Sequence, residues 1–352
     1  MIIAFAFPPN RRVGALRANY WYKELSTAIN CNTTVITAER GAIGEGVHVV
    51  PKTGTSFVNR LIKDDGVVWR KNIQMYLYKN DIPQPDLVII TGGPFMHFSL
   101  AKWFKNIYES KVILDYRDPF AINPGFDNSK LKVRIKLFFE KRFNKHAHAL
   151  VTVNDYCGKL VCRFDEKPNA IVQNGYDETV QPELKKVELK NPSFSYTGKF
   201  YFDAAPIIEA MEEMKLHFHC AGPDEVVPTE FIHPNGFVEY SEAVQLIADH
   251  DVAIIQTYGE DFQSTTKIFD YIRCKRAILI VSNNHIERGS IHEELKGYPN
   301  VFWAENTKDS IKESIVRIQQ TTYSEPNQDF HLKYSRKFQM QKLVELIQKV
   351  LK

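Results

Sequence analysis

The sequence of 352 residues is poor in cysteine, and its cysteines follow no metal-binding or disulfide pattern. There is no CxxC pair and no nearby set of cysteine and histidine ligands. Scattered cysteines of this kind are typical of reduced, buried thiols, so we expect neither disulfides nor a metal site. The five positions are Cys31, Cys157, Cys162, Cys220 and Cys274.

Long apolar runs are also absent. No stretch of about 18 apolar residues occurs, which argues against an integral membrane protein. The apolar segment 1–9 has no basic leader and no small-residue cleavage site, so it is interpreted as a buried first strand. A net charge of +3 is too small to indicate a nucleic-acid partner. We expect a cytoplasmic protein, and the chain length favours two domains.

Short apolar strands alternate with amphipathic helices along the chain, which predicts parallel α/β domains. In the first half, strands are expected at 2–7, 33–37, 47–50, 86–91, 111–115, 149–153 and 170–172, and helices at 16–28 and 98–108. The polar segment 176–192 is interpreted as a linker. In the second half, strands are expected at 194–196, 216–220, 252–255, 277–281 and 301–303, and helices at 204–214, 241–248, 308–319 and 338–351.

The segment 264–281 is the most informative one. Ser264, Thr265 and Thr266 form a polar loop that leads into a short helix, and an apolar strand follows. Hydroxyl and N–H groups at a helix N-terminus favour an anionic phosphate. Lys267 adds a positive charge, and Asp270 is placed to bind a ribose diol one turn deeper. The pattern predicts a nucleotide-diphosphate site in the second domain.

Several motifs occur in the order found in the retaining, glycogen-synthase-like family four of glycosyltransferases, whose fold is called GT-B. In the first half these are Phe7-Pro8-Pro9 with Gly14, Thr91-Gly-Gly-Pro, Val112-Ile-Leu-Asp-Tyr-Arg-Asp-Pro, Ala149-Leu-Val-Thr-Val-Asn and Val172-Gln-Asn-Gly-Tyr-Asp. In the second half they are Tyr196-Thr-Gly-Lys, Gly236-Phe-Val and Lys267-Ile-Phe-Asp-Tyr. The last resembles the variant of members that build bacterial envelope polysaccharides.

The resemblance implies two Rossmann-like, doubly wound domains that face a cleft, and a C-terminal helix that packs back toward the N-terminal domain. The expected ranges are 1–182 for the acceptor-side domain, 193–332 for the nucleotide-sugar domain and 333–352 for the returning helix. The expected activity is that of a metal-independent hexosyltransferase without a cofactor, which uses a nucleotide sugar, with UDP favoured, and a glycan or lipid-linked acceptor.

The resemblance also implies roles for individual residues. Gly198, Lys199 and the loop 264–267 would bind the donor diphosphate, Val238 would hold the base through its backbone, and Asp270 would hold the ribose. Gly14 would let the first loop approach the donor phosphate. The positions expected on the acceptor side are Gly14, Arg12, Arg17 and His97. Lys199, Lys267 and Asp118 are the expected catalytic residues.

Two departures from the family pattern stand out. The second phosphate-binding lysine is absent, because Tyr201-Phe202-Asp203 occupy its place. The pair of acidic residues is incomplete, because Phe262 stands where the first is expected. These changes leave a second hypothesis open, a catalytically weak module that binds a nucleotide sugar or a partner. A third hypothesis, a nucleotide-sugar epimerase or hydrolase, requires acid and base carboxylates that the sequence does not place.

Some residues admit two interpretations. Asp115 and Asp118 resemble a metal-binding pair, but Arg117 between them favours a structural ion pair. Asp118 either touches the sugar or acceptor or caps the turn before Pro119. His97 either reaches the cleft or has a surface or helix-capping role. The histidines at 217 and 219 are expected to pack on a sheet face.

The segment Lys130–His146 is the most basic in the chain, with seven Lys and Arg residues against one Glu. Its first eight residues alternate with period two, as in a strand, but the family has a helix there and a helix is expected. The helix is either a patch that attracts anionic lipid at the inner face of the plasma membrane, or a solvated basic face. Arg11 and Arg12 either extend this patch or contact a pyrophosphate-bearing acceptor.

Overall fold

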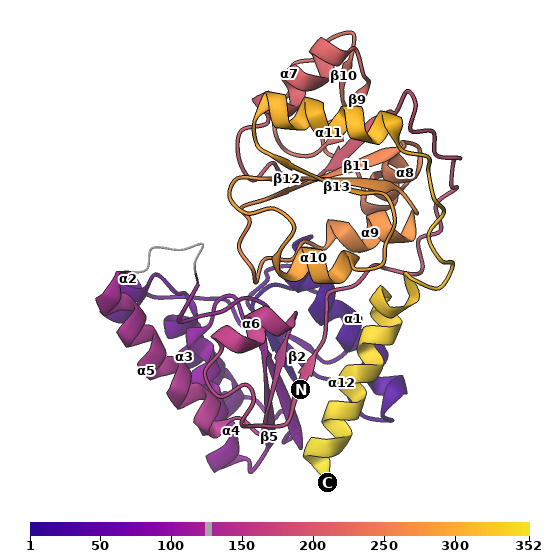
Figure 1. Ribbon diagram of the computed structural model, residues 1–352. Helices are drawn as coiled ribbons and strands as arrows, with labels where there is room; N and C mark the ends of the chain where they lie inside the picture. Colours follow the sequence, from indigo (N-terminus) through magenta and orange to yellow (C-terminus); the bar gives the residue numbers. More distant parts are fainter. Residues whose placement is uncertain (124–128) are drawn as a thin grey trace. The chain divides into compact units, whose positions relative to one another are not determined.

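The structure is a computed structural model that describes residues 1–123 and 129–352, without the side chains of Arg60 and Leu61 (Figure 1). It divides into two units. Unit 1 comprises Met1–Asn174 and Gln339–Lys352, and unit 2 comprises Gly175–Phe338. Among the described residues, no helix is both long and apolar enough to cross a bilayer.

Unit 1 is built on a sheet of seven parallel strands in the order β3-β2-β1-β4-β5-β6-β7. Every residue of the first two strands is buried, as expected for parallel strands that are covered on both faces. The strands are β1 (Ile2–Ala4), β2 (Val35–Thr37), β3 (Val47–Val49), β4 (Leu87–Thr91), β5 (Lys111–Tyr116), β6 (Ala149–Thr152) and β7 (Asn169–Ile171).

Two helices cover one face of this sheet. Ala18 and Trp21 of α1 (Val13–Ala28) share a buried cluster with Leu343 and Ile347 of α12 (Arg336–Leu351), and the two helices lie beside each other in Figure 1. The other face packs against α2 (Phe57–Ile62), α3 (Gly66–Lys79), the 3-10 helix η1 (Met96–Ser99), α4 (Leu100–Ile107), α5 (Lys130–His146) and α6 (Asp155–Leu160).

Unit 2 has a sheet of six parallel strands in the order β10-β9-β8-β11-β12-β13. Three adjacent strands, β8, β11 and β12, are buried at every position. The strands are β8 (Phe194–Thr197), β9 (Phe218–Ala221), β10 (Ile232–Pro234), β11 (Val252–Thr257), β12 (Ala277–Ser282) and β13 (Val301–Glu305).

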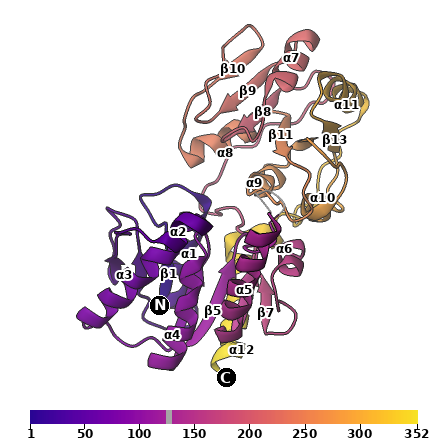
Figure 2. The same cartoon turned by 90° about the vertical axis from the view of Figure 1, so that its left-hand side faces the viewer.

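Helices cover both faces of the second sheet as well. One face packs against α7 (Ala205–Met214) and α11 (Lys308–Gln320), and the other against α8 (Tyr240–Ala248), α9 (Lys267–Arg273) and α10 (Gly289–Leu295). Figure 2 shows α7 and α8 on opposite sides of the strands β8 to β10. A short 3-10 helix, η2 (Leu332–Tyr334), precedes α12. The two sheets confirm the predicted fold class of two Rossmann-like units with parallel strands.

The helix predicted over Lys130–His146 is confirmed as α5. Glu140 in this helix is fully buried, and its carboxylate accepts hydrogen bonds from the N–H groups of Ala121 and Cys162. Other elements were not predicted, namely α2, α3, α6, α10 and β10. The segment 176–192, interpreted as a linker, contributes buried Val187 and Leu189 to a core cluster of unit 2.

Candidate functional site

Two glycine turns meet beyond the ends of β8 and β9 in unit 2. Gly198 has φ +91°, a conformation that residues with a Cβ rarely adopt, and its N–H donates to the carbonyl of Ala221 at 2.6 Å. A Cβ on Gly222 would lie 2.4 Å from the carbonyl oxygen of Gly198. Both positions therefore require glycine, and the backbone here is open at the edge where parallel sheets bind ligands.

Lys267 projects into this edge from the first position of α9. Its Nζ lies 3.8 Å from the centroid of the Tyr196 ring and 5.4 Å from that of Tyr201. Within the described part of the chain, this Nζ has no hydrogen-bond partner. Burial lowers the pKa of Lys267 to about 7, although Asp224 acts in the opposite direction. The ammonium is therefore held by aromatic faces, which attract a cation without neutralising it.

The predicted phosphate loop leads directly into α9. Thr265 is buried, and the hydroxyl of Ser264 donates to both carboxylate oxygens of Glu294 at 2.8 and 2.9 Å. This interaction occupies the Ser264 hydroxyl that the sequence assigned to phosphate. The N–H groups of Ile268 and Phe269 at the start of α9 are also engaged, because they donate to the carbonyls of Thr265 and Thr266 at 3.3 and 3.2 Å.

Asp270 lies one turn further along α9 and is also buried. Its Oδ1 accepts a hydrogen bond from the Tyr240 hydroxyl at 2.7 Å. Burial raises the pKa of Asp270 to about 6, while Tyr240, Arg336 and Arg273 hold the increase down. Asp270 is thus a buried carboxyl group that accepts a hydrogen bond from Tyr240 and lies near the cations of Arg336 and Arg273.

The remaining donor-side residues lie at the same end of the sheet. The Lys199 side chain is exposed, while its carbonyl accepts a hydrogen bond from the Tyr196 hydroxyl at 2.7 Å. Val238 is half-buried in the loop between β10 and α8. A cavity of about 10 Å³ lies between the turns and is lined by Gly198, Phe200, Cys220, Ala221, Gly222, Asp224, Val226, Pro234 and Gly236. This volume is that of about one water molecule.

In unit 1, Arg17 forms a buried ion pair with Asp115. Arg17 Nε and Nη2 donate to the two carboxylate oxygens at 3.1 and 2.9 Å, and Nη1 donates to the Gln173 carbonyl at 3.1 Å. Both side chains are almost completely buried. The expected structural ion pair of Asp115 therefore exists, but its partner is Arg17 and not Arg117. The guanidinium of Arg17 is already engaged, although the sequence placed it on the acceptor side.

Gly14 and Arg117 are in direct steric contact. Gly14 lies inside α1, which begins earlier than expected, and a Cβ on it would come within 1.8 Å of Arg117 Nη1. Arg117 in turn donates a hydrogen bond to the Gly92 carbonyl. The missing Cβ of Gly14 thus makes room for a guanidinium of the same unit. Asp118 follows directly after this arginine and is exposed.

His97 is completely buried, which corrects both interpretations made from the sequence. Its Nε2 lies 3.1 Å from the Thr91 carbonyl, and its ring packs edge-to-face against Trp69. Burial lowers the pKa of His97 to about 3. It is a neutral core residue rather than a cleft, surface or capping residue, because η1 turns its side chain toward α3.

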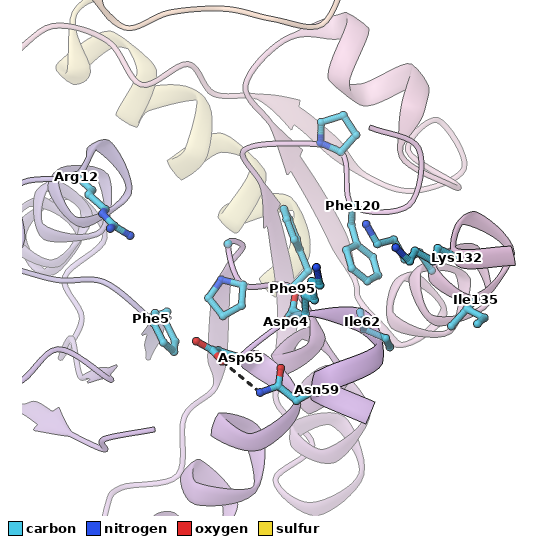
Figure 3. Close-up of a pocket in the computed structure, with 15 residues that line it drawn as sticks. Phe5, Arg12, Asn59, Ile62, Asp64, Asp65, Phe95, Phe120, Lys132 and Ile135 are labelled. Atoms are coloured by element: carbon cyan, nitrogen blue, oxygen red, sulfur yellow. Dashed lines mark hydrogen bonds between the residues drawn. The ribbon is translucent and has the colours of Figure 1, made fainter. Parts of the chain in front are cut away.

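A large cavity of about 760 Å³ lies in unit 1, and Figure 3 shows its lining. Of the residues expected on the acceptor side, Arg12 lines it, and Gly14, Arg17 and His97 do not. The lining also includes Asp64, which accepts hydrogen bonds from the N–H groups of Gly66, Phe95 and Met96.

Sequence reasoning missed several residues at these two sites. Tyr196 and Tyr201 flank Lys267, and Asp224 accepts a hydrogen bond from the Phe200 N–H at 2.8 Å. The Ala-Gly-Pro turn that ends β9 was a usable signal for Gly222 and Asp224. No signal in the sequence indicated the pairing of Glu294 with Ser264, because the two residues lie on separate elements.

Comparison with known proteins finds similar structures but no similar sequences. No family model matches the sequence, and no curated protein matches it. Among solved structures, Alr3699/HepE from Anabaena in complex with UDP is similar over 99% of both chains, with TM-score 0.66 and 12% identity. The glycotransferase of kitacinnamycin is similar over 100% of this chain and 99% of that one, with TM-score 0.58 and 12% identity.

A third similar structure is UGT89C1 from Arabidopsis thaliana, complexed with UDP-L-rhamnose. It covers 100% of this chain and 98% of its own, with TM-score 0.57 and 10% identity. At such identities the likeness concerns the fold alone. With two parallel-sheet units of seven and six strands, the chain has the GT-B fold of glycosyltransferases.

Proposed function

We propose that the protein is a retaining hexosyltransferase that moves a sugar from a nucleotide diphosphate, with UDP favoured, to a glycan or lipid-linked acceptor. We further propose a role in bacterial surface polysaccharide synthesis, in the cytoplasm or at the inner face of the plasma membrane. The observation that carries the proposal is the buried ammonium of Lys267, without a hydrogen-bond partner among the described residues, at the start of α9.

The reaction accounts for a cation at this place. When the glycosidic bond breaks, negative charge develops on the leaving diphosphate, and placed cations and N–H dipoles stabilise it. Lys267 supplies the first cation. Lys199, exposed in the turn after β8, supplies a second cation. These groups perform the task that a metal ion performs in other transferases.

The donor nucleoside would occupy the neighbouring positions. The carboxylate of Asp270 accepts hydrogen bonds from the ribose hydroxyls, and the backbone at Val238 binds the base. Two of the similar structures are complexes with UDP or UDP-L-rhamnose, which supports UDP as the nucleotide. Asp118, exposed after β5, is the residue proposed to contact the sugar or the acceptor.

The proposal is tested by incubating the protein with UDP-, GDP-, dTDP- and CMP-sugars and measuring released nucleotide and transferred sugar. Thermal shifts with the free nucleotides identify the base, because a bound nucleotide stabilises the folded state by mass action. NMR of the product anomer distinguishes retention from inversion. Inverted products would contradict the retaining mechanism while leaving the transferase intact.

A second candidate is a module that binds a nucleotide sugar without transferring it. Tyr201-Phe202-Asp203 stand in the place of a second phosphate-binding lysine, and the Tyr201 ring flanks Lys267, which favours the second candidate. Saturable binding of a nucleotide sugar without turnover in any acceptor mixture would select it over the transferase.

A further inference from the structure

The cavity of unit 1 has a lining that differs from the donor site in chemistry. Fifteen residues line it, all from unit 1, and its volume of about 760 Å³ is that of a site for a medium-sized organic ligand. We propose that it binds the phosphate or diphosphate of a lipid together with the first part of the apolar chain. Binding of the lipid does not depend on the proposed function. Only the role of this lipid as the carrier of the acceptor sugar rests on it.

The apolar part of the lining is aromatic and continuous with the core. Phe95 packs against Phe120 with ring centroids 5.3 Å apart, and Phe5 packs edge-to-face on Trp69. The other apolar residues of the lining are Ile62, Pro94, Pro119 and Ile135. Covering exposed rings and branched side chains with an apolar group removes their surface from water, which is favourable. This part of the lining suits a hydrocarbon chain.

The two carboxylates of the cavity are already engaged within the protein. Asp64 accepts three backbone N–H groups at 2.7 to 3.1 Å. Asp65 pairs with Lys52 at 2.7 Å and accepts from the Asn59 amide at 3.3 Å, the contact drawn as a dashed line in Figure 3. Their oxygens are therefore largely occupied and are poorly placed to bind sugar hydroxyls, although Asp64 keeps its negative charge.

Four cationic side chains complete the lining. Figure 3 shows Arg12 and Lys132 on opposite sides of the cavity, with Phe95 and Phe120 between them. The other two are Lys63, which follows α2, and Lys136, whose Nζ lies 5.6 Å from the centroid of the Phe120 ring. Cations beside apolar rings complement a ligand in which a phosphate is joined directly to a hydrocarbon.

The outer surfaces of α2 and α5, next to the cavity, also combine apolar and basic side chains. Phe57 on α2 is 80% exposed, and Leu131 on α5 is 70% exposed. Lys130 and Arg134 are exposed on α5 as well. Apolar and basic side chains together are the combination that binds an anionic lipid surface. A lipid phosphate in the cavity therefore continues into a surface that suits the membrane from which it comes.

A free oligosaccharide fits this lining less well. Sugars are bound by many neutral or acidic hydrogen-bonding groups, whereas here the carboxylates are engaged and the remaining polar groups are mainly cations. A free phosphate would contact the cations but would leave the aromatic part of the cavity uncovered. The lipid phosphate is the ligand class that uses both parts.

The test is calorimetric binding of three probes to the whole protein without nucleotide. Farnesyl diphosphate contains both groups, inorganic diphosphate lacks the chain, and farnesol lacks the charge. We expect farnesyl diphosphate, used below its micellar concentration, to bind at least tenfold more tightly than either partial probe. Ile135→Glu, which places a charge in the lining, should weaken its binding at least tenfold.

The matched control is Phe138→Glu, which also replaces an apolar side chain by a charged one on α5, about one turn later, at a 60% exposed position outside the lining. It should change the affinity less than twofold, and thermal melting verifies that both variants are folded. Equal binding of inorganic and farnesyl diphosphate would overturn the proposal, as would equal effects of the two variants. Titration of the same proteins with UDP keeps the inference separate from the donor site, because farnesyl diphosphate binding without UDP binding contradicts only the proposed function.

Discussion

The Nζ of Lys267 lies 3.8 Å from the centroid of the Tyr196 ring. Tyr196 is a fully buried residue of β8, so the ring is held in place by the core. The amine thus lies against an aromatic face, and its pKa of about 7 divides it between the neutral and charged forms near neutral pH. A diphosphate that binds here supplies a direct hydrogen-bonding counter-charge, whereas Asp224 acts on this amine without a hydrogen bond to it.

Asp270→Asn is expected to abolish the preference for a ribose diol. The wild-type carboxylate accepts from the two hydroxyls, so UDP should bind more tightly than 2′,3′-dideoxy-UDP by roughly tenfold or more. In the variant this ratio should fall to near one, and calorimetry with both nucleotides measures it. In the wild type, UDP affinity should also decrease as the pH falls below about 6, where Asp270 is protonated. An unchanged ratio in the variant would place the ribose elsewhere.

Gly14→Ala is expected to destabilise unit 1 by about 1–3 kcal/mol, because the new Cβ overlaps the guanidinium of Arg117. The double variant Gly14→Ala with Arg117→Ala should recover part of this loss, since alanine is favoured over glycine within a helix. Thermal melting measures both. UDP affinity should be normal in the double variant if Gly14 serves Arg117. A persistent loss of UDP binding would instead support the approach of this residue to the donor phosphate.

Arg17→Ala is expected to cost about 3–5 kcal/mol of stability, because it leaves the buried carboxylate of Asp115 without its partner. Arg17→Lys keeps the charge but loses the two-pronged contact, and should be intermediate. Replacing both residues of the pair by leucine should cost less than Arg17→Ala. If Arg17→Ala melts like the wild type and only raises the KM for acceptor, the residue has the acceptor role expected from the sequence.

Acid should destabilise unit 1 through His97. The unfolded chain binds a proton at this residue near pH 6.5, while the folded chain binds it only near pH 3. Stability is therefore fully present above pH 6.5 and is lost as the pH falls through this window, by up to about 1.4 kcal/mol per pH unit. His97→Gln removes the titration. Its free energy of unfolding should be lower at pH 7 and should decline less between pH 6 and 4. If the free energies of unfolding of wild type and variant fell in parallel with pH, His97 would not be the cause of the acid destabilisation.

Much of the fold follows from local patterns in the sequence. The apolar strands of both units end within a few residues of their predicted ends, because parallel strands that are buried on both faces appear as continuous apolar runs. The helix α3 was not predicted, because its sequence lacks a clear local pattern. Its consecutive residues Val67, Val68 and Trp69 are all buried, so the helical periodicity is weak.

The candidate site was less accessible from the sequence. The loop 264–266, Lys267 and Asp270 were visible because they lie close together along the chain. The aromatic partners of Lys267 come from β8 and the turn that follows it, and the cavity of unit 1 combines segments from Phe5 to Lys136. Such sets are created by tertiary packing, which no local pattern specifies.

The most direct test of the account is a calorimetric titration of UDP into the wild type and Lys267→Met at pH 6.5. Lys190→Met, an exposed lysine before the opposite end of β8, serves as the control. We predict that Lys267→Met weakens UDP binding by tenfold or more, as expected for the loss of a charge-assisted contact to phosphate. The control should retain wild-type affinity. Equal affinity of Lys267→Met and wild type, or no UDP binding by any of the three proteins, would contradict the account.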